Sequence, residues 1–474
     1  MPGKSLIRLV AILCLTPTLL ASGAPAKESV RVYPVPVGEP MSKRFTVSVK
    51  GQSAPVYVAH VKAIGTVGTA TVKEEQVDGE ASFALFDLKG EATVTVTCAE
   101  KVKAVKVLPT SRGIVAKIEG SSVSFKVAGP DQLTVEVNGD WNNSLHVFVS
   151  GFEKDAPNLK DPNLIYFGPG MHVIAPMSVG SGKTVYIAGG AVVYGKLPEG
   201  VPNGGAVFLL KGNDITLRGR GIIDGSLMPW HHGELVSPVG ENLRMEGVVL
   251  RDPPGFAVPI RESNHVTVEN VKLLGWRLNG DGIDIINSRD VTVSDSFVRV
   301  FDDLVVVKAS TQGGQESRDI TVKHMVLWNE IAHSLSLGAE LRVNAENILF
   351  TDCDVIHDKG REWSLRVFNT DSGTVKHVVF EKIRMEEDRR PFSLWIGKDM
   401  WSRDAERGHI EDVEFRDIEA ARPEQLDHAI QLVGFDAGHG VRGVSFERVM
   451  LGGKPMKMSE IEQNAFVSDV SVKP

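Results

Sequence analysis

The stretch HVTVENVKLLGW, residues 265–276, is followed after a glycine turn by DVTVSDSFVRVFDD, residues 290–303. Each consists of a short alternating strand, a polar turn and a second apolar strand, the pattern of β structure with one buried face. The same unit recurs as DITLRGRGIIDG, NLRMEGVVLRD, DITVKHMVLWNE, NILFTDCDVIHD, HVVFEKIRMEED, DVEFRDIEA and GVSFERVML. The second residues of the nine units fall at 215, 243, 266, 291, 320, 348, 378, 413 and 444, so successive steps run from 23 to 35 residues.

This repeat predicts a solenoid. A unit of one to three strands cannot bury its own apolar face, so it must stack on copies of itself, and a parallel β-helix does this. Long helical periodicities are almost absent between the units, which excludes βαβ crossovers. A β-propeller is the alternative, but its blades take roughly 40 residues or more, and most of the steps are shorter.

The N-terminal part of the chain has a different pattern. Short alternating segments such as KRFTVSVKG, EATVTVTC and QLTVEVNGD each end in Gly, Asn, Asp or Cys and predict an antiparallel sandwich. A proline-containing segment, GFEKDAPNLKDPNLIYFGPG, follows at residues 151–170. We therefore predict a β-sandwich domain over residues 27–155 and a β-helix over residues 156–474.

The first 26 residues have the composition of a secretory signal peptide. Lys4 and Arg8 precede an apolar run over residues 9–20, and small residues lead to Ala-Pro-Ala before Lys27. Removal of this segment would leave Cys98 and Cys353, too few for a disulfide framework. We expect a periplasmic or extracellular protein without an integral membrane segment, because no later apolar run is long enough to cross a bilayer.

The composition is that of an ordinary soluble protein with a formal net charge of −8. This balance argues against a nucleic-acid partner and gives no general attraction for an acidic polymer. The oligomeric state is not predicted by the sequence.

A set of carboxylates follows the repeat. Asp281 lies in an Asn-Gly-Asp-Gly turn, and Asp302 and Asp303 follow close to one coil later. Residues one coil apart lie on neighbouring strands, about 4.8 Å apart, and His333 and Arg366 fall on the next two coils. Because adjacent residues of a strand point to opposite faces, we place Asp302 and Asp303 at a bend or bulge before the run LVVV.

Other polar residues of the repeats are expected to be solvated. Asp284, Asp295 and Asp352 fall at turn or polar-face positions. The run WHH at residues 230–232 is interpreted as a loop tip, because no third ligand follows at a useful spacing for a metal. We predict neither a metal nor a cofactor.

In order and approximate spacing, NGDGIDI, FDDLVVVK, AHSLSLGAE and SLRVF resemble the active-site motifs of glycoside hydrolase family 28, the polygalacturonases: Asn-Thr-Asp, Asp-Asp, Gly-His-Gly and Arg-Ile-Lys. A sandwich joined to a β-helix is also similar to the related family 49, the dextranases and isopullulanases. The resemblance covers roughly residues 160 to 460. The expected fold is all-β: a right-handed parallel β-helix, a pectin-lyase-like solenoid, after an N-terminal β-sandwich.

The resemblance implies a secreted inverting glycoside hydrolase acting on a polysaccharide or oligosaccharide. Asp302 would protonate the glycosidic oxygen, and Asp281 with Asp303 would deprotonate the attacking water. His333 would adjust their proton affinity beside the substrate, and Arg366 would bind the substrate.

The departures from the family motifs bear on the substrate. Ala332 and Ser334 stand where the family has glycines, and Phe368 stands where it has the lysine that binds the uronate carboxylate. A phenyl ring there suggests stacking on a less charged sugar, so we expect a substrate other than plain polygalacturonate. Trp395 and Trp401, on a late loop, are the tryptophans expected to stack on sugar.

Two other functions stay open. A polysaccharide lyase on the same solenoid would need a uronate, a basic proton acceptor and often Ca²⁺, for which the three aspartates could be ligands. A glycan-binding β-helix without catalysis would not depend on them.

Overall fold

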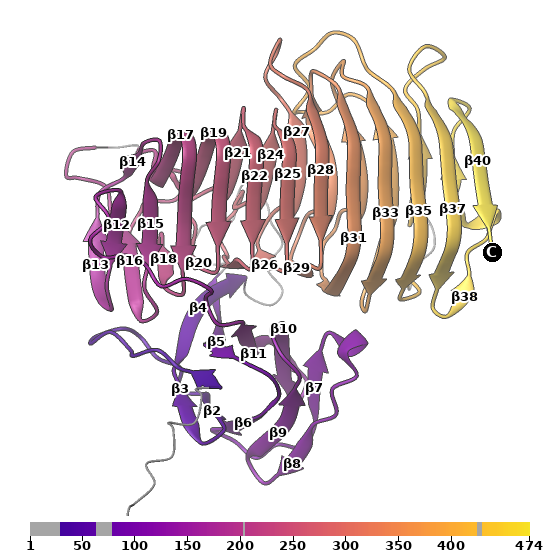
Figure 1. Ribbon diagram of the computed structural model, residues 1–474. Helices are drawn as coiled ribbons and strands as arrows, with labels where there is room; N and C mark the ends of the chain where they lie inside the picture. The colour runs from indigo at the N-terminus through magenta and orange to yellow at the C-terminus, as the bar shows by residue number, and fades with distance from the viewer. Residues whose placement is uncertain (1–28, 63–77, 202–203, 424–428) are drawn as a thin grey trace, which may run out of the picture.

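The computed structural model describes residues 29–62, 78–201, 204–423 and 429–474, and its regular secondary structure is almost entirely β strand (Figure 1). The expected signal peptide, residues 1–26, lies outside the described residues. Within the described ranges the strands are interrupted by the short 3-10 helices η2 (Thr110–Arg112) and η3 (Met458–Glu460). None of the described helices is long and apolar enough to cross a membrane. The all-β prediction is confirmed.

Two sheets facing one apolar core make up the N-terminal sandwich. The first sheet contains β1 (Val30–Arg31), β4 (Val56–Lys62), β5 (Asp78–Leu88), β7 (Val105–Leu108), β10 (Asp131–Val137) and β11 (Asp140–Ser150). The second contains β2 (Phe45–Val49), β3 (Gln52–Ala54), β6 (Ala92–Cys98), β8 (Lys117–Glu119) and β9 (Ser122–Val127). The pairing is antiparallel, as expected, except between β5 and β11, which run parallel.

The remainder of the chain forms a solenoid of parallel strands. Its longer sheet contains β12 (Leu164–Phe167), β13 (Gly170–Ile174), β14 (Met177–Val179), β15 (Thr184–Ile187), β16 (Ala191–Gly195), β17 (Ala206–Gly219), β18 (Ile222–Asp224), β19 (Glu234–Glu246), β20 (Val249–Arg251), β22 (Asn264–Glu269), β23 (Lys272–Leu274), β25 (Arg289–Ser294), β26 (Phe297–Val300), β28 (Ser317–Lys323), β29 (Val326–Asn329), β31 (Ala345–Asp358), β33 (Val375–Met385), β35 (Ile410–Ala420), β37 (Val441–Leu451), β38 (Lys454–Pro455) and β40 (Val467–Lys473). Its shorter sheet contains β21 (Val258–Arg261), β24 (Ile283–Ile286), β27 (Val305–Ala309), β30 (Leu335–Leu341), β32 (Leu365–Asn369), β34 (Phe392–Ile396), β36 (Ile430–Val433) and β39 (Glu462–Gln463). β11 ends at Ser150 and β12 begins at Leu164, so the expected boundary at residue 155 lies in the connecting segment.

The register of the longer sheet follows the sequence repeat. The second residues of the nine repeat units are direct neighbours from coil to coil, beginning with Ile215 beside Leu243 and ending with Val413 beside Val444. All of these pairings are parallel, which is the arrangement of a β-helix and not of a propeller blade. Inside the solenoid, equivalent apolar residues form stacks, for example the rings of Phe350, Phe380, Phe415 and Phe446.

The backbone conformation of the first residue of each repeat unit explains which residue types occur there. This residue has positive φ, between 50° and 70°, in every one of the nine units. Only Gly, Asn, Asp and, less readily, His adopt this left-handed conformation at low cost. The nine positions are occupied by Asp214, Asn242, His265, Asp290, Asp319, Asn347, His377, Asp412 and Gly443.

The sandwich packs along the flank of the solenoid, below β20, β23, β26 and β29 in Figure 1. A shared apolar cluster joins Phe83 and Phe148 of the sandwich to Phe297 and Trp328 of the solenoid. Beside it, the Arg299 guanidinium is fully buried, donates to Asn142 of the sandwich and pairs with Glu330 at 2.9 Å. The two domains are therefore joined by an apolar cluster at their interface, with a buried ion pair beside it.

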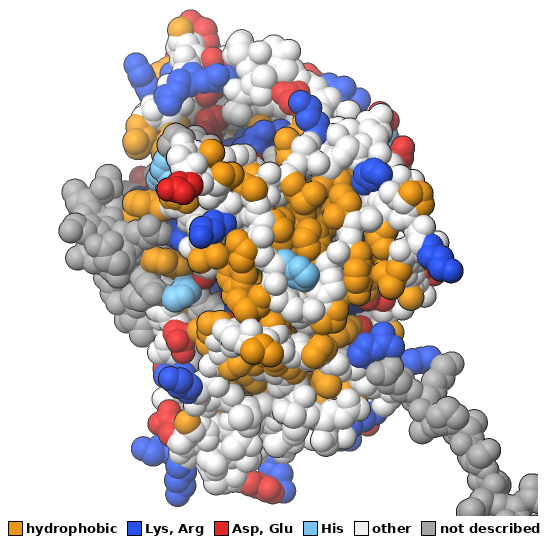
Figure 2. Space-filling model, turned by 90° about the vertical axis from the view of Figure 1, so that its left-hand side faces the viewer, with side chains coloured by type: hydrophobic (Ala, Val, Ile, Leu, Met, Phe, Trp, Pro, Cys, Tyr) orange, Lys and Arg blue, Asp and Glu red, His pale blue; other side chains and the backbone are white. Residues whose placement is uncertain are grey.

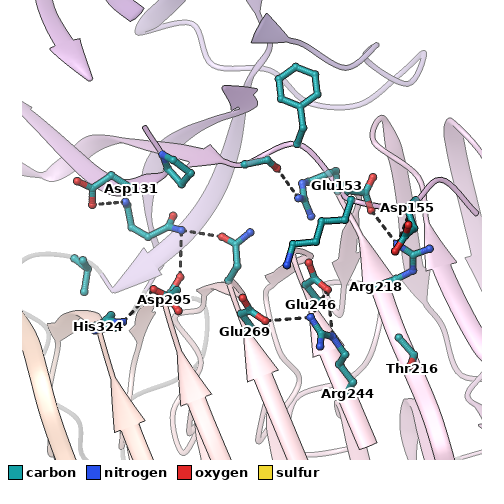
Figure 3. Close-up of a pocket in the computed structure, with 18 of the residues that line it drawn as sticks. Asp131, Glu153, Asp155, Thr216, Arg218, Arg244, Glu246, Glu269, Asp295 and His324 are labelled. Atoms are coloured by element: carbon teal, nitrogen blue, oxygen red, sulfur yellow. Dashed lines mark hydrogen bonds and ion pairs between the residues drawn. The ribbon is translucent and has the colours of Figure 1, made fainter. Parts of the chain in front are cut away.

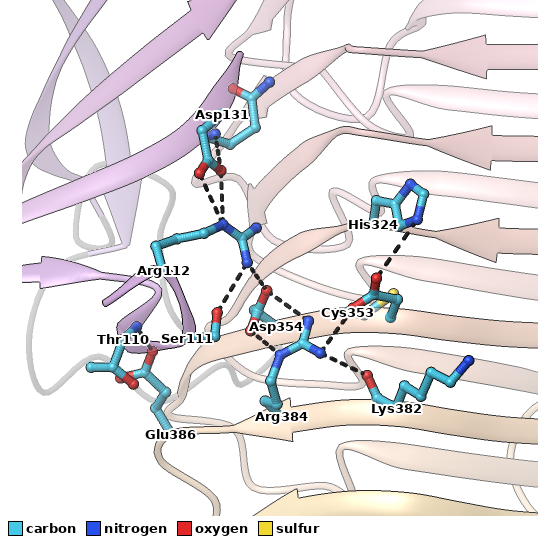
Figure 4. Close-up of polar contacts among 12 residues, drawn as sticks. Thr110, Ser111, Arg112, Asp131, His324, Cys353, Asp354, Lys382, Arg384 and Glu386 are labelled. Atoms are coloured by element: carbon cyan, nitrogen blue, oxygen red, sulfur yellow. Dashed lines mark hydrogen bonds and ion pairs between the residues drawn. The ribbon is translucent and has the colours of Figure 1, made fainter. Parts of the chain in front are cut away.

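Polar contacts extend this interface along the solenoid (Figure 4). Arg112, in η2, bridges Asp131 of the sandwich and Asp354 of β31, with both N···O distances at 2.9 Å. Arg384 of β33 binds the same Asp354 carboxylate. The backbone N–H of Thr110 donates to Glu386 of the following segment.

The described residues of the sandwich leave part of the first coil of the solenoid exposed. Figure 2 shows hydrophobic side chains across this end of the molecule. Tyr166, Met171 and Val173 of β12 and β13 are 43 to 59% exposed. The described part of the sandwich thus packs mainly on the side of the solenoid.

Candidate active site

Asp281 lies in the turn that leads into β24. The WHH loop supports this turn, because the Trp230 indole donates to the Leu278 carbonyl at 2.8 Å and the His231 ring lies 3.2 Å from the same oxygen. The Asp281 carboxylate is buried and accepts from Lys308 Nζ at 3.0 Å. The WHH run, predicted to be a loop tip, therefore also holds the turn that contains Asp281.

Asp302 and Asp303 lie in a bend between β26 and β27, just before the apolar strand. The Asp302 N–H donates to the Gly280 carbonyl at 3.3 Å, and the Gly282 N–H donates to the Asp303 carbonyl at 2.8 Å. These two bonds enclose Asp281, so the three aspartates lie at the same turn of neighbouring coils. The Asp303 N–H also donates to Asp302 Oδ1 at 3.1 Å.

His333 occupies this turn position one coil later, where its carbonyl accepts from the Leu304 N–H at 2.9 Å. Its Nδ1 lies 2.8 Å from the Trp363 carbonyl, which makes Nδ1 the protonated nitrogen and leaves Nε2 to accept from Arg366 at 3.4 Å. Burial and the Arg366 guanidinium lower the pKa of His333 to about 3. The imidazole is therefore neutral over the range in which the aspartates titrate.

Arg366 projects outward from β32. Its guanidinium pairs with Glu362 at 3.0 Å and lies 3.9 Å from the Phe368 ring centroid and 4.9 Å from that of Trp363. Burial lowers the pKa of Arg366 to about 10, although Glu362 favours the charged form. Its charge is already balanced within the site.

A cleft of about 380 Å³ contains these groups. Trp401 lines it and is 40% exposed. Trp395 is not among the lining residues, because it lies one coil beyond Phe368 in the register and packs on that ring, with centroids 5.1 Å apart. The cleft therefore brings together Asp281, Asp302, Asp303, His333, Arg366 and Trp401, whereas Trp395 supports its wall.

Two charged residues of this site were missed by the sequence interpretation. Asp284, expected to be solvated, is fully buried in β24, whereas Asp295 and Asp352 are about half exposed. Lys308, at the end of β27, reaches Asp284 at 2.9 Å as well as Asp281. The available signal was a single polar residue inside each of the apolar strands IDII and VVVKA.

The three aspartates hold their protons more tightly than exposed carboxyls do. Burial, opposed by Lys308 and reinforced by the other aspartates, raises the pKa of Asp281 well above its usual range. Burial and the Asp302 carboxylate do the same to the pKa of Asp303. Burial also raises the pKa of Asp302, against the influence of Lys308. Such a cluster can keep a proton at one carboxyl while another is ionised.

Among the residues that the structure describes, no three His, Cys, Asp or Glu side chains converge where they could hold a metal ion. The ammonium of Lys308 lies between Asp281 and Asp284, at the place where a cation bound by these two carboxylates would have to sit. Cys98 and Cys353 are buried free thiols in separate domains.

A larger cavity of about 850 Å³ lies between the sandwich and the solenoid (Figure 3). Its charged side chains largely pair with one another: Arg244 contacts both Glu246 and Glu269, and His324 lies 3.3 Å from Asp295. None of its lining residues belongs to the cleft. The candidate site residues thus gather in the cleft alone among the described cavities.

Comparison with known proteins agrees with this geometry. Residues 212–468, more than half of the chain, match the family described as Glycosyl hydrolases family 28. The endo-polygalacturonases of Pectobacterium carotovorum subsp. carotovorum and Pectobacterium parmentieri are both 26% identical, over 164 and 160 residues, covering 32% of this chain. The match spans 38% of the length of these curated relatives.

Two solved structures share the fold. Dex49A from Penicillium minioluteum has a TM-score of 0.63 at 14% identity, covering 93% of this chain and 96% of its own. A hyperthermoactive exopolygalacturonase from Thermotoga maritima has a TM-score of 0.53 at 14% identity, covering 65% of this chain and 84% of its own. The predicted architecture, a right-handed parallel β-helix after a β-sandwich, is confirmed.

Proposed function

The chain belongs to glycosyl hydrolases family 28, and from this membership we propose that it hydrolyses O-glycosidic bonds of a polysaccharide or oligosaccharide with inversion at the anomeric carbon. The observation that carries the proposal is the gathering of Asp281, Asp302 and Asp303 at one turn of two neighbouring coils, inside a cleft.

The resemblance to the family motifs suggests a role for each aspartate. Asp302 is the general acid that protonates the leaving glycosidic oxygen, and its place in the cleft beside the other two aspartates supports this role. Asp281, with Asp303, takes the proton of the attacking water, and its contact with Lys308 favours the ionised form. Inversion requires the acid and the base to be roughly 6.5 to 9.5 Å apart, so that water fits between the base and the sugar.

Substrate binding falls to His333, Arg366 and Trp401, with Trp395 acting through Phe368. Neutral His333 can exchange hydrogen bonds with sugar hydroxyls without competing for the catalytic proton. The exposed indole of Trp401 offers a flat apolar surface to a sugar ring.

The charges of the cleft favour a neutral glycan over polygalacturonate. Its described lining carries six carboxylates, namely Asp281, Asp302, Asp303, Glu340, Glu362 and Asp399, against the three cations Lys308, Arg361 and Arg366. Each cation has a carboxylate within 4 Å. A uronate carboxylate would have to displace one of these partners, whereas a neutral sugar can stack on Phe368 and Trp401.

The composition of residues 1–26 supports export to the periplasm or the extracellular space. Polysaccharides too large to enter a cell are met there, which agrees with a glycan-degrading role.

The test is a screen of the purified protein on dextran, pullulan, polygalacturonate, rhamnogalacturonan, and algal and host glycans. Reducing ends and ultraviolet absorbance are recorded together, with Asp302→Asn in parallel. New reducing ends without absorbance, lost in the variant, are expected, and NMR of the first product should reveal the inverted anomer. Absorbance that rises with product and disappears with a chelator would identify a lyase and overturn the assignment.

A further inference from the structure

One ammonium group lies among the carboxylates of the cleft. Lys308 Nζ is 3.0 Å from Asp281 Oδ2 and 2.9 Å from Asp284 Oδ1. The exposed fractions of the three side chains are 9%, 6% and 0%, so water screens this group of charges poorly. Phe256 covers the ammonium from one side, with its ring centroid 4.9 Å from Nζ.

The register of the shorter sheet produces this contact. Ile283 and Ile285 point into the core, so Asp284 between them points outward. Lys308 lies on the next coil, beside Ile286, and its long side chain reaches back to Asp284 and to the Asp281 turn. Asp284 does not line the cleft and lies behind Lys308.

Several carboxyl groups surround this one ammonium. The carboxyl groups near Lys308 are Asp281, Asp284, Asp303 and Glu340, and Asp302 lies close to the same ammonium. A positive charge in direct contact with a buried carboxyl favours its ionised form. A buried carboxyl that the ammonium does not touch receives less of this stabilisation. Of the three candidate catalytic aspartates, Asp281 is the one that Lys308 Nζ contacts directly, at 3.0 Å.

We propose that Lys308, anchored by Asp284, is a positioning residue that holds Asp281 ionised and oriented toward the water it activates. This inference rests on the proposed function, because it takes Asp281 as the base of the hydrolysis. It also assigns Asp284 a purpose: the second carboxylate fixes the ammonium, so that Lys308 supports Asp281 without turning toward the substrate.

The two partners should shift the pH profile in opposite directions. Lys308→Met removes a positive charge that lowers the pKa of both Asp281 and Asp302, so both limbs of the kcat/KM profile should move to higher pH. Asp284→Asn removes a negative charge that raises the same pKa values, so both limbs should move to lower pH. Other charged or titratable groups also face Lys308 and the aspartates, and both variants leave them in place. They are Asp303, Glu340, His333, Arg361 and Arg366.

Activity gives the second measurement. We expect Lys308→Met to lower kcat by up to about 10²-fold, because the general base that it positions contributes about 10²- to 10⁴-fold, with little change in KM. Methylammonium should restore part of the activity of Lys308→Ala by occupying the vacated space, whereas methanol should not. Lys272→Met is the matched control, because it removes another buried lysine, at the domain interface, and should leave the pH profile in place.

The charge inference can be tested without a substrate. In protein carrying ¹³C at the aspartate carboxyl carbon, the Asp281 signal is assigned by its loss in Asp281→Asn. Its titration should move to higher pH in Lys308→Met, and if the protein hydrolyses none of the glycans, this result still separates the inference from the proposed function. The double variant Lys308→Met/Asp284→Asn removes one positive and one negative charge, so its net charge is that of the wild type. It is measured in place of Lys308→Met if that variant does not fold. Shifts of the same sign in both single variants, or an unchanged Asp281 titration, would refute the proposal.

Discussion

Replacing Asp303 by Asn should stabilise the protein while abolishing its activity. Asp303 is half-buried, and its Oδ1 atom is buried without a hydrogen-bond partner among the described residues. Burial and the Asp302 carboxylate raise its pKa well above the value of an unfolded aspartate, about 3.9. An uncharged side chain of the same shape removes the repulsion.

The size of the effect follows from the spacing of the coils. Asp303 and the Asp281 turn lie on neighbouring coils, about 4.8 Å apart. With an effective dielectric constant of about 20, two unit charges at that distance repel by about 3.5 kcal/mol. Because the cluster keeps part of its protons, the recovered free energy is smaller, and we expect a gain of about 1–2 kcal/mol at pH 8, in the range of other stabilising substitutions.

The sign of the pH dependence is fixed by the raised pKa. The folded protein holds the Asp303 proton in a range where the unfolded chain has released it, so the stability of the wild type falls as pH rises from about 4 through the folded pKa. The advantage of Asp303→Asn should therefore be absent near pH 3 and largest above neutral pH.

Guanidinium unfolding of both proteins at pH 3, 5, 7 and 8 measures this difference. Asp319→Asn is the control, because Asp319 is a half-exposed turn residue with φ of 58°, which Asn also adopts. An equal gain at all pH values, or a loss at pH 8, would show that Asp303 is not under the repulsion inferred from its burial.

Three further outcomes follow from the cleft and the core. Phe368→Lys should raise kcat/KM on polygalacturonate relative to a neutral glycan by about 10-fold or more, the worth of one charge-assisted hydrogen bond, and an unchanged ratio would remove Phe368 from substrate selection. Trp401→Ala should raise KM by about 2- to 10-fold through loss of a stacking surface, while Trp395→Ala should chiefly lower the thermal midpoint; equal KM effects would contradict their different placement. Phe415→Ala, in the stacked ring column, should cost about 3–5 kcal/mol in urea unfolding, and a cost below 1 kcal/mol would mean that the column is not tightly packed.

Much of the fold was readable because each coil repeats the same local requirements. The residues with positive φ that open the nine repeat units, such as Asp290 and Asn347, are all Gly, Asn, Asp or His, and the next residue is apolar because it enters the core. A pattern that satisfies a backbone angle and an inward side chain in every coil is visible in one sequence. The repeat pattern therefore predicts which residues of the longer sheet are neighbours from coil to coil.

The site was less readable because its contacts join side chains, not backbone positions. Asp284 alternates with isoleucines, as a solvated residue of an edge strand also would, and only the neighbouring coil reveals that Lys308 covers it. Trp395 and Trp401 are six residues apart in similar surroundings of the sequence. Trp395 follows the strand register and packs on Phe368. Trp401 lies in the loop that follows and lines the cleft.

The position of the site within the coil explains how chemistry can be added without disturbing the fold. The same turn, just before the shorter sheet, contributes Asp281, Asp303, His333 and Trp363 in four successive coils, since the strands that follow are in register. The backbone bonds of this turn run from coil to coil and do not depend on which side chain is present. Exchanging one of these side chains therefore alters the cleft at a known height along the solenoid, while the apolar residue two positions later keeps its place in the core.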